Sequence, residues 1–166
     1  LRPLRRAPRT LQLGDTPRMS PQTAHPCTAA LASIPSANLN KYLGKGFAYG
    51  GRGPDVYDCY GLVKAIHADR GIDLPEYLST TDKSLIHEMV MQGRELFVSL
   101  DKPEPWCVVT FAIHPRFVSH VGVVLDDSRR FIHIMEKTSV SVERLDALEW
   151  APRIRGFYSY DKTSAA

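Results

Sequence analysis

The sequence has only three cysteines, Cys27, Cys59 and Cys107. An odd number of widely spaced cysteines without a C-x-x-C pair does not form the framework of a disulfide-stapled secreted domain, so we expect reduced thiols. No apolar run approaches the roughly 20 residues that a membrane helix requires, so we expect no membrane insertion. The Arg-rich start is not followed by an apolar stretch, and we therefore predict no secretory signal peptide.

The sequence also lacks the charge pattern of a nucleic-acid-binding protein. The first 18 residues hold five arginines and one aspartate, so they carry more than the whole net charge of +3. A basic segment beside a nearly neutral body is not a clustered basic face, and basic and aromatic residues do not alternate. We expect no nucleic-acid partner.

Motifs for metal and phosphate binding are absent as well. No Gly-Lys-Ser or Gly-Lys-Thr follows the glycines at 50, 51 and 53, which argues against a phosphate-binding loop. No H-E-x-x-H pattern or cysteine pair accompanies His114, His120 and His133, which argues against zinc. The sequence predicts no metal and no cofactor.

The chain has the length of one ordinary domain, with 166 residues. Residues 1–36 are rich in Pro, Arg, Ser, Thr and Ala without an apolar period, which predicts a disordered or extended basic tail and linker. We place one folded domain at residues 37–161 and a C-terminal tail at residues 162–166.

Three helices are expected in the first half of the domain. Residues 36–43 predict a short helix that Gly44 ends, and a glycine-rich turn follows. Asp58 is a good N-cap for a second helix that ends at Gly71. A third helix is expected over residues 82–92, with its apolar residues on a buried face: Leu85, Ile86, Met89 and Val90.

The second half of the domain alternates between apolar and polar residues, as strands do. The helices precede these strands, so the sequence predicts an α+β fold with helices packed on an antiparallel sheet. The expected strands span residues 106–113, 120–125, 130–136, 140–145 and 154–160.

Cys59 is the candidate nucleophile because it falls on the first turn of the second helix. A thiol reacts as thiolate, and its pKa falls at a helix N-terminus or beside an imidazolium. Cys107 stands among apolar strand residues and is expected in the core, and Cys27 is expected to be exposed. The predicted sheet supplies His120 and His133 as candidate partners of Cys59, whereas we expect His67, His87 and His114 to be solvent-facing or in loops.

The two histidines flank a turn, so their relation can be tested from hairpin geometry. A two-residue loop at Asp126 and Asp127 pairs His120 with His133 directly, whereas a four-residue loop to Arg129 places His133 opposite Gly122. Both registers put the two imidazoles on one face, and in the second register Gly122 leaves room for the His133 ring. A loop of one or three residues would separate them.

These positions suggest one mechanism. His120 accepts the Cys59 proton, the thiolate attacks an amide carbonyl, and His120 then protonates the leaving amine. His133 fixes the orientation and tautomer of His120. Backbone N–H groups at the start of the Cys59 helix are the expected oxyanion donors.

The stretch GFAYGGRGPDVYDCYGLV at residues 46–63 resembles the NlpC family of cell-wall cysteine peptidases. GIDLPEY, SHVGVVL and FIHI follow in the family's order. The RGPD turn, the SVERL segment and RIRGFYSY resemble more narrowly the branch found in bacteriophage tail assembly proteins and gene-transfer agents. The resemblance covers residues 38–160.

The resemblance implies a papain-like fold with Cys59, His120 and His133 as the catalytic residues. It implies cleavage of the γ-D-glutamyl to diamino-acid bond of peptidoglycan stem peptides, and other phage tail proteins as partners. The expected location is the virion tail, or the host cytoplasm before assembly, with action at the bacterial cell wall.

The sequence departs from the family at Phe47, where a tyrosine hydroxyl often assists the oxyanion. Tyr49 or Tyr57 is a possible substitute. The candidates for oxyanion stabilisation and substrate positioning are Phe47, Tyr49, Asp58 and Tyr60. Two alternatives stay open: a structural tail-tip or assembly protein with weak or lost catalysis, and a cysteine hydrolase or acyltransferase acting on another amide or ester.

Overall fold

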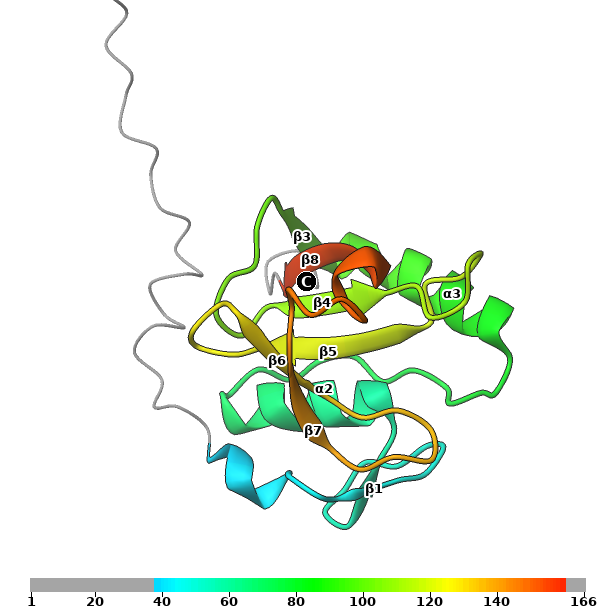
Figure 1. Ribbon diagram of the computed structural model, residues 1–166. Coiled ribbons are helices and arrows are strands. Elements are labelled where there is room, and N and C mark those ends of the chain that lie inside the picture. Colours follow the sequence, from blue (N-terminus) through cyan, green and yellow to red (C-terminus); the bar gives the residue numbers. More distant parts are fainter. Residues whose placement is uncertain (1–37, 161–166) are drawn as a thin grey trace, which may run out of the picture.

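The computed structural model describes residues 38–160, so the predicted tails at 1–36 and 162–166, and Cys27, lie outside the described residues. The helices and strands follow the predicted order, which confirms the α+β class (Figure 1). The helical elements are η1 (Leu39–Lys41), α2 (Cys59–Asp69), α3 (Lys83–Gly93), η2 (Arg94–Leu96) and η3 (Ala151–Arg153). The strands are β1 (Gly46–Phe47), β2 (Val56–Tyr57), β3 (Phe97–Leu100), β4 (Val108–Phe111), β5 (His120–Val124), β6 (Arg130–His133), β7 (Ser141–Arg144) and β8 (Ile154–Tyr160).

Six strands form one sheet in the order β3-β8-β4-β5-β6-β7. Every neighbouring pair is antiparallel, as the sequence predicts. The short strands β1 and β2 form a separate parallel pair just before α2. Within residues 38–160, no helix is both long and apolar enough to cross a membrane.

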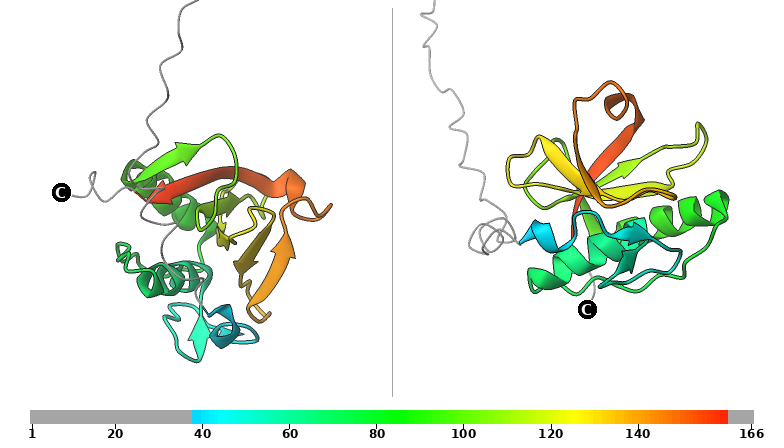
Figure 2. Two further views of the ribbon diagram at one scale, coloured as in Figure 1. Left: turned by 90° about the vertical axis from the view of Figure 1, so that its left-hand side faces the viewer. Right: turned by 60° about the horizontal axis from the view of Figure 1, so that its bottom comes forward.

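Each face of the sheet carries its own hydrophobic cluster. One face packs against α2, whose predicted stripe of Leu62, Val63 and Ile66 is fully buried among strand residues such as Val123 and Ile132. The other face holds a second cluster that includes Phe111, Phe131 and Trp150. Figure 2 shows α2 and α3 on the same side of the sheet, so the second cluster is covered by the chain between β7 and β8.

Three sequence predictions of secondary structure are wrong or incomplete. The helix expected at residues 36–43 is only the 3-10 turn η1, because so short a segment gains few hydrogen bonds for the cost of helix nucleation. The strand expected from residue 106 begins at Val108, since Trp106 has a φ of 67° in the left-handed region. Strand β3 was not predicted, because it is an edge strand with Val98 and Ser99 exposed.

Candidate active site

Cys59 is the first residue of α2, as predicted, and the local backbone fixes it there. Asp58 caps the helix by accepting a hydrogen bond from the Gly61 N–H at 2.6 Å. Gly61 permits the glycine-rich turn to pack onto this helix, because a Cβ at that position would collide with the carbonyl oxygen of Gly51. The candidate nucleophile therefore stands at a helix start that is held by the Asp58 cap and by the packing of the glycine-rich turn against Gly61.

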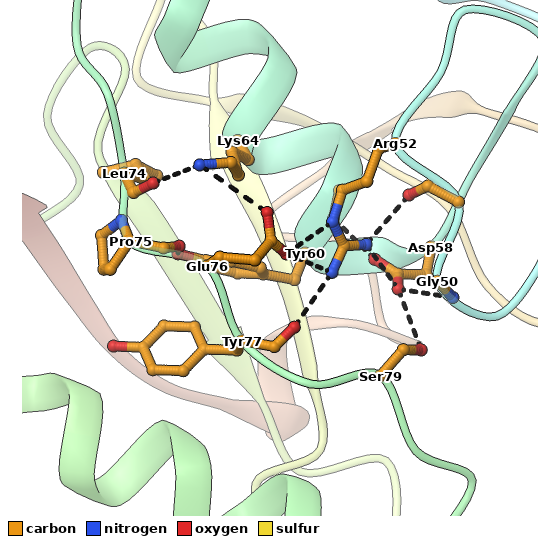
Figure 3. Close-up of polar contacts among 12 residues, drawn as sticks. Gly50, Arg52, Asp58, Tyr60, Lys64, Leu74, Pro75, Glu76, Tyr77 and Ser79 are labelled. Carbon is orange, nitrogen blue, oxygen red and sulfur yellow. Dashed lines mark hydrogen bonds and ion pairs between the residues drawn. The ribbon is translucent and has the colours of Figure 1, made fainter.

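The Asp58 carboxylate is also the centre of a polar network at the start of α2 (Figure 3). Its second oxygen accepts hydrogen bonds from the Gly50 N–H at 3.0 Å, from Arg52 Nη1 at 2.8 Å and from the Ser79 hydroxyl at 3.2 Å. Arg52 Nε additionally donates to Glu76 at 2.8 Å. Asp58 is therefore fully engaged with the protein and holds the helix start rather than offering a free carboxylate.

Residues 72–80, which we call the connecting segment, are tied across α2 by the same network. The Tyr60 hydroxyl donates to the Pro75 carbonyl at 2.7 Å, and Arg52 Nη2 donates to the Tyr77 carbonyl at 3.2 Å. Lys64 donates to the Leu74 carbonyl (Figure 3). The Tyr60 ring thus positions the wall of the site, with its hydroxyl bonded to the connecting segment.

The two histidines adopt the register with the four-residue loop. Val123 pairs with Ile132 and Val124 with Phe131, which places His133 opposite Gly122. A Cβ at Gly122 would lie 3.3 Å from the His133 Cβ, tighter than most real contacts, so this glycine leaves the room that the sequence suggested. His120 Nε2 and His133 Nδ1 are 3.0 Å apart, which confirms the prediction that the imidazoles share a face.

Cys59 and His120 line the same cavity, with a volume of about 510 Å³. The backbone of Val121, the residue after His120, approaches the Cys59 sulfur within hydrogen-bonding reach. Among the residues that the structure describes, no hydrogen bond joins the sulfur to His120. Hydrogen bonds at catalytic sites are often long without substrate and tighten when it binds. The cavity is also lined by Phe47, Tyr49, Arg52, Asp58, Tyr60, Ser79 and Lys83.

Burial favours the neutral forms of both partners. It raises the pKa of the Cys59 thiol to about 11, and the neighbouring Asp58 carboxylate adds to the rise. Burial, then the neighbouring His133 and Lys83, hold the pKa of His120 well below its usual range. The sequence predicted a lowered thiol pKa from the helix N-terminus, and this direction is wrong because burial is the largest influence on the Cys59 pKa.

His133 lies behind His120 rather than in the cavity. It is buried, and burial lowers its pKa to about 4. Its Nδ1 faces His120, so its Nε2 points away into the second hydrophobic cluster. The structure therefore places the third candidate where it can orient His120 but cannot touch a substrate in the cavity.

Tyr49 supplies a hydroxyl near the position where Phe47 lacks one. Both residues line the cavity, and their rings meet edge to face with centroids 5.0 Å apart. The Tyr49 hydroxyl donates to Glu136 at 2.8 Å, and this bond raises the pKa of the phenol. Tyr57 packs in the core against Tyr42 instead, so of the two possible substitutes only Tyr49 borders the cavity.

Several residues that line the cavity were not among the predicted site residues. Arg52, Ser79 and Lys83 line the cavity, yet none of them stands in a pattern with a recognised chemical meaning. Their place at the cavity becomes apparent only when the fold brings their segments to Cys59. The structure also corrects His67, which is buried in α2 with its Nδ1 2.8 Å from the Val63 carbonyl, rather than solvent-facing.

The prediction for His87 is also wrong, because this residue lies half-buried in α3, where its Nδ1 accepts a hydrogen bond from the Val118 N–H at 3.2 Å. Cys107 is buried in the second cluster, as expected of a core residue. His114 lies exposed in the loop before β5. Within the part of the chain that the structure describes, no three His, Cys, Asp or Glu side chains gather to hold a metal ion.

Comparison with curated proteins finds related endopeptidases. A probable endopeptidase p60 from Listeria innocua is 28% identical over 126 residues, which cover 73% of this chain and 23% of the relative. The chain therefore spans under a quarter of that protein's length, and the relative's remaining regions have no counterpart in the alignment.

Comparison with solved structures finds the same fold. A protein of the NlpC/P60 family from Bacillus cereus aligns with a TM-score of 0.55 and 21% identity, over 76% of this chain and 41% of that one. The NlpC/p60 domain of the peptidoglycan hydrolase SagA aligns with a TM-score of 0.53 and 19% identity, over 80% of this chain and 97% of that domain. At these identities the likeness establishes the α+β fold.

The family model covers the parts of the chain that build the cavity. Residues 44–159 match it, a range that includes Cys59, His120, His133 and the connecting segment between α2 and α3. This match spans most of the described residues and agrees with the fold of the solved relatives. The chain therefore belongs to the NlpC/P60 family.

Proposed function

We propose that this chain is a cysteine peptidase that hydrolyses an amide bond in the stem peptides of peptidoglycan. The observation that carries the proposal is that Cys59, at a helix start, and His120, which is bonded to His133 behind it, line one cavity. Family membership supports it, since relatives of this fold include endopeptidases and a peptidoglycan hydrolase.

The first chemical step is attack with coupled proton transfer. His120 Nε2 faces His133, so its Nδ1 is the nitrogen available to the cavity. The neutral imidazole takes the thiol proton as the sulfur bonds to the carbonyl carbon, and the carbonyl π electrons move to its oxygen. The neutral resting forms favoured by burial suit this route, because the base is free to accept a proton.

The second step breaks the amide. The protonated His120 gives its proton to the leaving nitrogen, the C–N bond breaks, and an acyl-thioester remains on Cys59. Water then attacks the acyl carbon as His120 accepts its proton, the C–S bond breaks to release the carboxylic acid, and His120 returns the proton to the Cys59 sulfur. The backbone N–H groups of the first turn of α2 are the candidate oxyanion donors, and Tyr49 is the candidate side-chain donor.

The finer proposal concerns the bond and the setting. The resemblance of residues 46–63 to cell-wall peptidases favours the γ-D-glutamyl to diamino-acid bond. The RGPD turn and the closing RIRGFYSY favour a protein carried by a phage or phage-like tail, where cleavage would open the wall during genome delivery. In that setting the partners are stem peptides and other tail proteins.

A second candidate function rests on Phe47. A structural tail-tip or assembly protein would need the fold without full activity, and losing one oxyanion donor costs on the order of 3 kcal/mol in the barrier. Tyr49 stands beside Phe47 at the cavity, but its hydroxyl is bonded to Glu136. The substitution Phe47→Tyr tests the structural candidate. A large gain in kcat would show that the missing hydroxyl weakens catalysis in this chain and would favour the second candidate function.

The decisive experiment is digestion of purified muropeptides, with products identified by mass spectrometry. We expect cleavage by the unaltered chain, none by Cys59→Ala, and full cleavage by the matched control Cys107→Ala, whose cysteine lies in the second cluster. Muropeptides that stay intact with folded, unaltered protein would reject the peptidase.

The tail setting needs its own experiment. Mass spectrometry of purified phage or phage-like particles from the producing cells is expected to detect this chain at a fixed ratio to tail proteins. Its recovery only in free fractions would reject the tail assignment and leave the peptidase proposal untouched.

A further inference from the structure

We propose that Trp150 is a positioning residue of the catalytic site: its indole face accepts a hydrogen bond from His133 Nε2–H and thereby fixes the tautomers of both histidines. The inference rests on the proposed Cys–His chemistry and extends it to a residue that sequence analysis did not single out. Trp150 lies between β7 and β8, about thirty residues along the chain from His120.

One nitrogen of the histidine pair lacks a polar partner within residues 38–160. His133 is only 4% exposed, and its Nε2 is buried with no conventional hydrogen-bond partner among the described residues. A buried polar group without a partner is uncommon in a native structure and calls for an explanation. Its other nitrogen is accounted for by the 3.0 Å contact with His120.

Only one arrangement of the protons lets His120 act as base. One proton lies between His120 Nε2 and His133 Nδ1. If His133 Nδ1 donated, neutral His120 would carry its own proton on Nδ1 and could accept none from Cys59. Therefore His120 Nε2–H donates and His133 Nδ1 accepts, which puts the His133 proton on Nε2, the buried nitrogen without a polar partner.

The surroundings of that nitrogen are aromatic. The Trp150 ring centroid lies 4.6 Å from that of His133, with the ring planes at 75°, an edge-to-face arrangement. Such geometry suits an N–H bond directed at a π face, which is electron-rich. Phe131 also contacts His133, but its ring is tilted at 36°, closer to stacking and less suited to accept an N–H.

Trp150 is itself held firmly in place. It is 4% exposed and packs against Phe111 and Phe131 with centroids 5.1 and 5.2 Å away. Its backbone N–H donates to the Ala147 carbonyl at 2.9 Å. The indole therefore forms a rigid support behind the two histidines.

The first test measures the tautomers in the unaltered protein by long-range ¹H–¹⁵N NMR of the histidine rings. We expect His133 to be protonated on Nε2 and not on Nδ1, with a slowly exchanging proton shifted upfield by the indole ring current. A proton on His133 Nδ1 would overturn the proposal. A rapidly exchanging Nε2 proton with a cross-peak to water would also overturn it, because water would then be the acceptor.

The second test compares Trp150→Leu with Trp150→Phe, which keeps a π face. For the leucine variant we expect kcat to fall about tenfold with little change in KM, since outer-shell orienting groups have effects of this size. We expect the phenylalanine variant to keep most of kcat and the Nε2–H tautomer. Equal losses in both variants, with unchanged tautomers, would assign Trp150 a packing role only.

The pH profile adds a readout that lost stability alone would not move. Without the indole, water reaches His133 and the acid limb of kcat shifts to higher pH, because burial is what lowers the pKa of this imidazole. The other ionisable groups around the pair are Cys59, Lys83 and Arg153, and all are retained in both variants. An unshifted acid limb in Trp150→Leu would count against the proposal.

These outcomes separate this inference from the proposed function. If muropeptides stay intact but His133 carries its proton on Nε2 against Trp150, the peptidase assignment fails and the tautomer assignment stands. If muropeptides are cleaved and the proton lies on Nδ1, only the role of Trp150 fails.

Discussion

The two helices that border the cavity differ sharply in how they are packed. Helix α2 buries five of its residues and carries Cys59 on its first turn. Helix α3 is of equal length, yet among its described residues only Gly93 is buried, and Leu85 on its predicted core face is 44% exposed. Both helices carry an apolar stripe, but only the stripe of α2 packs into a core.

The two walls of the cavity differ in the same way in what they contribute to the site. The candidate nucleophile and the histidine pair stand on α2, β5 and β6, where close packing holds side chains in a defined geometry. The opposite wall, with Ile86, Met89 and Val90, leaves its apolar side chains half-buried over the cavity. That wall is free to contact a bound peptide without supporting the fold.

The largest effect we predict comes from the packed wall. Removal of the nucleophile by Cys59→Ala should reduce kcat for muropeptide cleavage by roughly 10⁴-fold or more, since no other group can form the thioester. The α3 substitution Met89→Ala should mainly raise KM. Steady-state kinetics of both variants checks the contrast, and a large fall in kcat for Met89→Ala would break it.

A stability comparison of two isoleucines addresses the packing directly. Ile66 in α2 is fully buried, so Ile66→Ala should lower the free energy of unfolding by about 4 kcal/mol. Ile86 in α3 is half-buried at the cavity, so Ile86→Ala should cost about 1 kcal/mol. Urea denaturation measures both. Similar losses would mean that α3 is as well packed as α2.

Acidification should lower the free energy of unfolding through a residue of the packed helix α2. Burial lowers the pKa of His67 in α2 to about 4, from an ordinary value of 6.5. Between pH 6.5 and 4, His67 is therefore protonated in the unfolded chain but not in the folded chain. The free energy of unfolding consequently falls as pH drops from 6.5 towards 4, by about 3 kcal/mol for this residue.

The variant His67→Gln isolates this contribution, because glutamine can still donate to the Val63 carbonyl but does not titrate. Urea denaturation at pH 7 and at pH 4.5 should show a smaller loss on acidification in the variant. An unchanged loss would place the acid sensitivity elsewhere.

The last comparison concerns the link between the two walls. Asp58→Ala removes the cap of α2 and leaves Arg52 without its buried partner, so it should lower the free energy of unfolding by about 2 kcal/mol. The matched control, Asp146→Ala, breaks the fully exposed pair with Arg144 and should change stability little.

Loss of Asp58 should also loosen the connecting segment, which Ser79 and Arg52 tie to its carboxylate. Hydrogen exchange is expected to quicken at residues 72–80 in Asp58→Ala and to stay unchanged in Asp146→Ala. Unchanged exchange in both variants would show that the two walls are held together by other contacts.

Much of the site could be predicted because its signals are local. An N-cap residue followed by an apolar stripe placed Cys59 on a helix start. The register of the hairpin placed His120 and His133 on one face of the sheet, with Gly122 leaving room between them. The edge strand β3 and the role of Arg52 could not be found in this way. Their residues follow no period, and their contacts join segments that are distant in sequence.

The sequence by itself determined the order of elements, the helix that carries the thiol and the shared face of the imidazoles, because capping, periodicity and strand register depend on neighbours along the chain. Only the tertiary structure decided the direction of the Cys59 pKa, the unequal packing of the two apolar helices and the aromatic support behind His133. Desolvation and packing depend on what the rest of the chain brings close, and no local pattern records that.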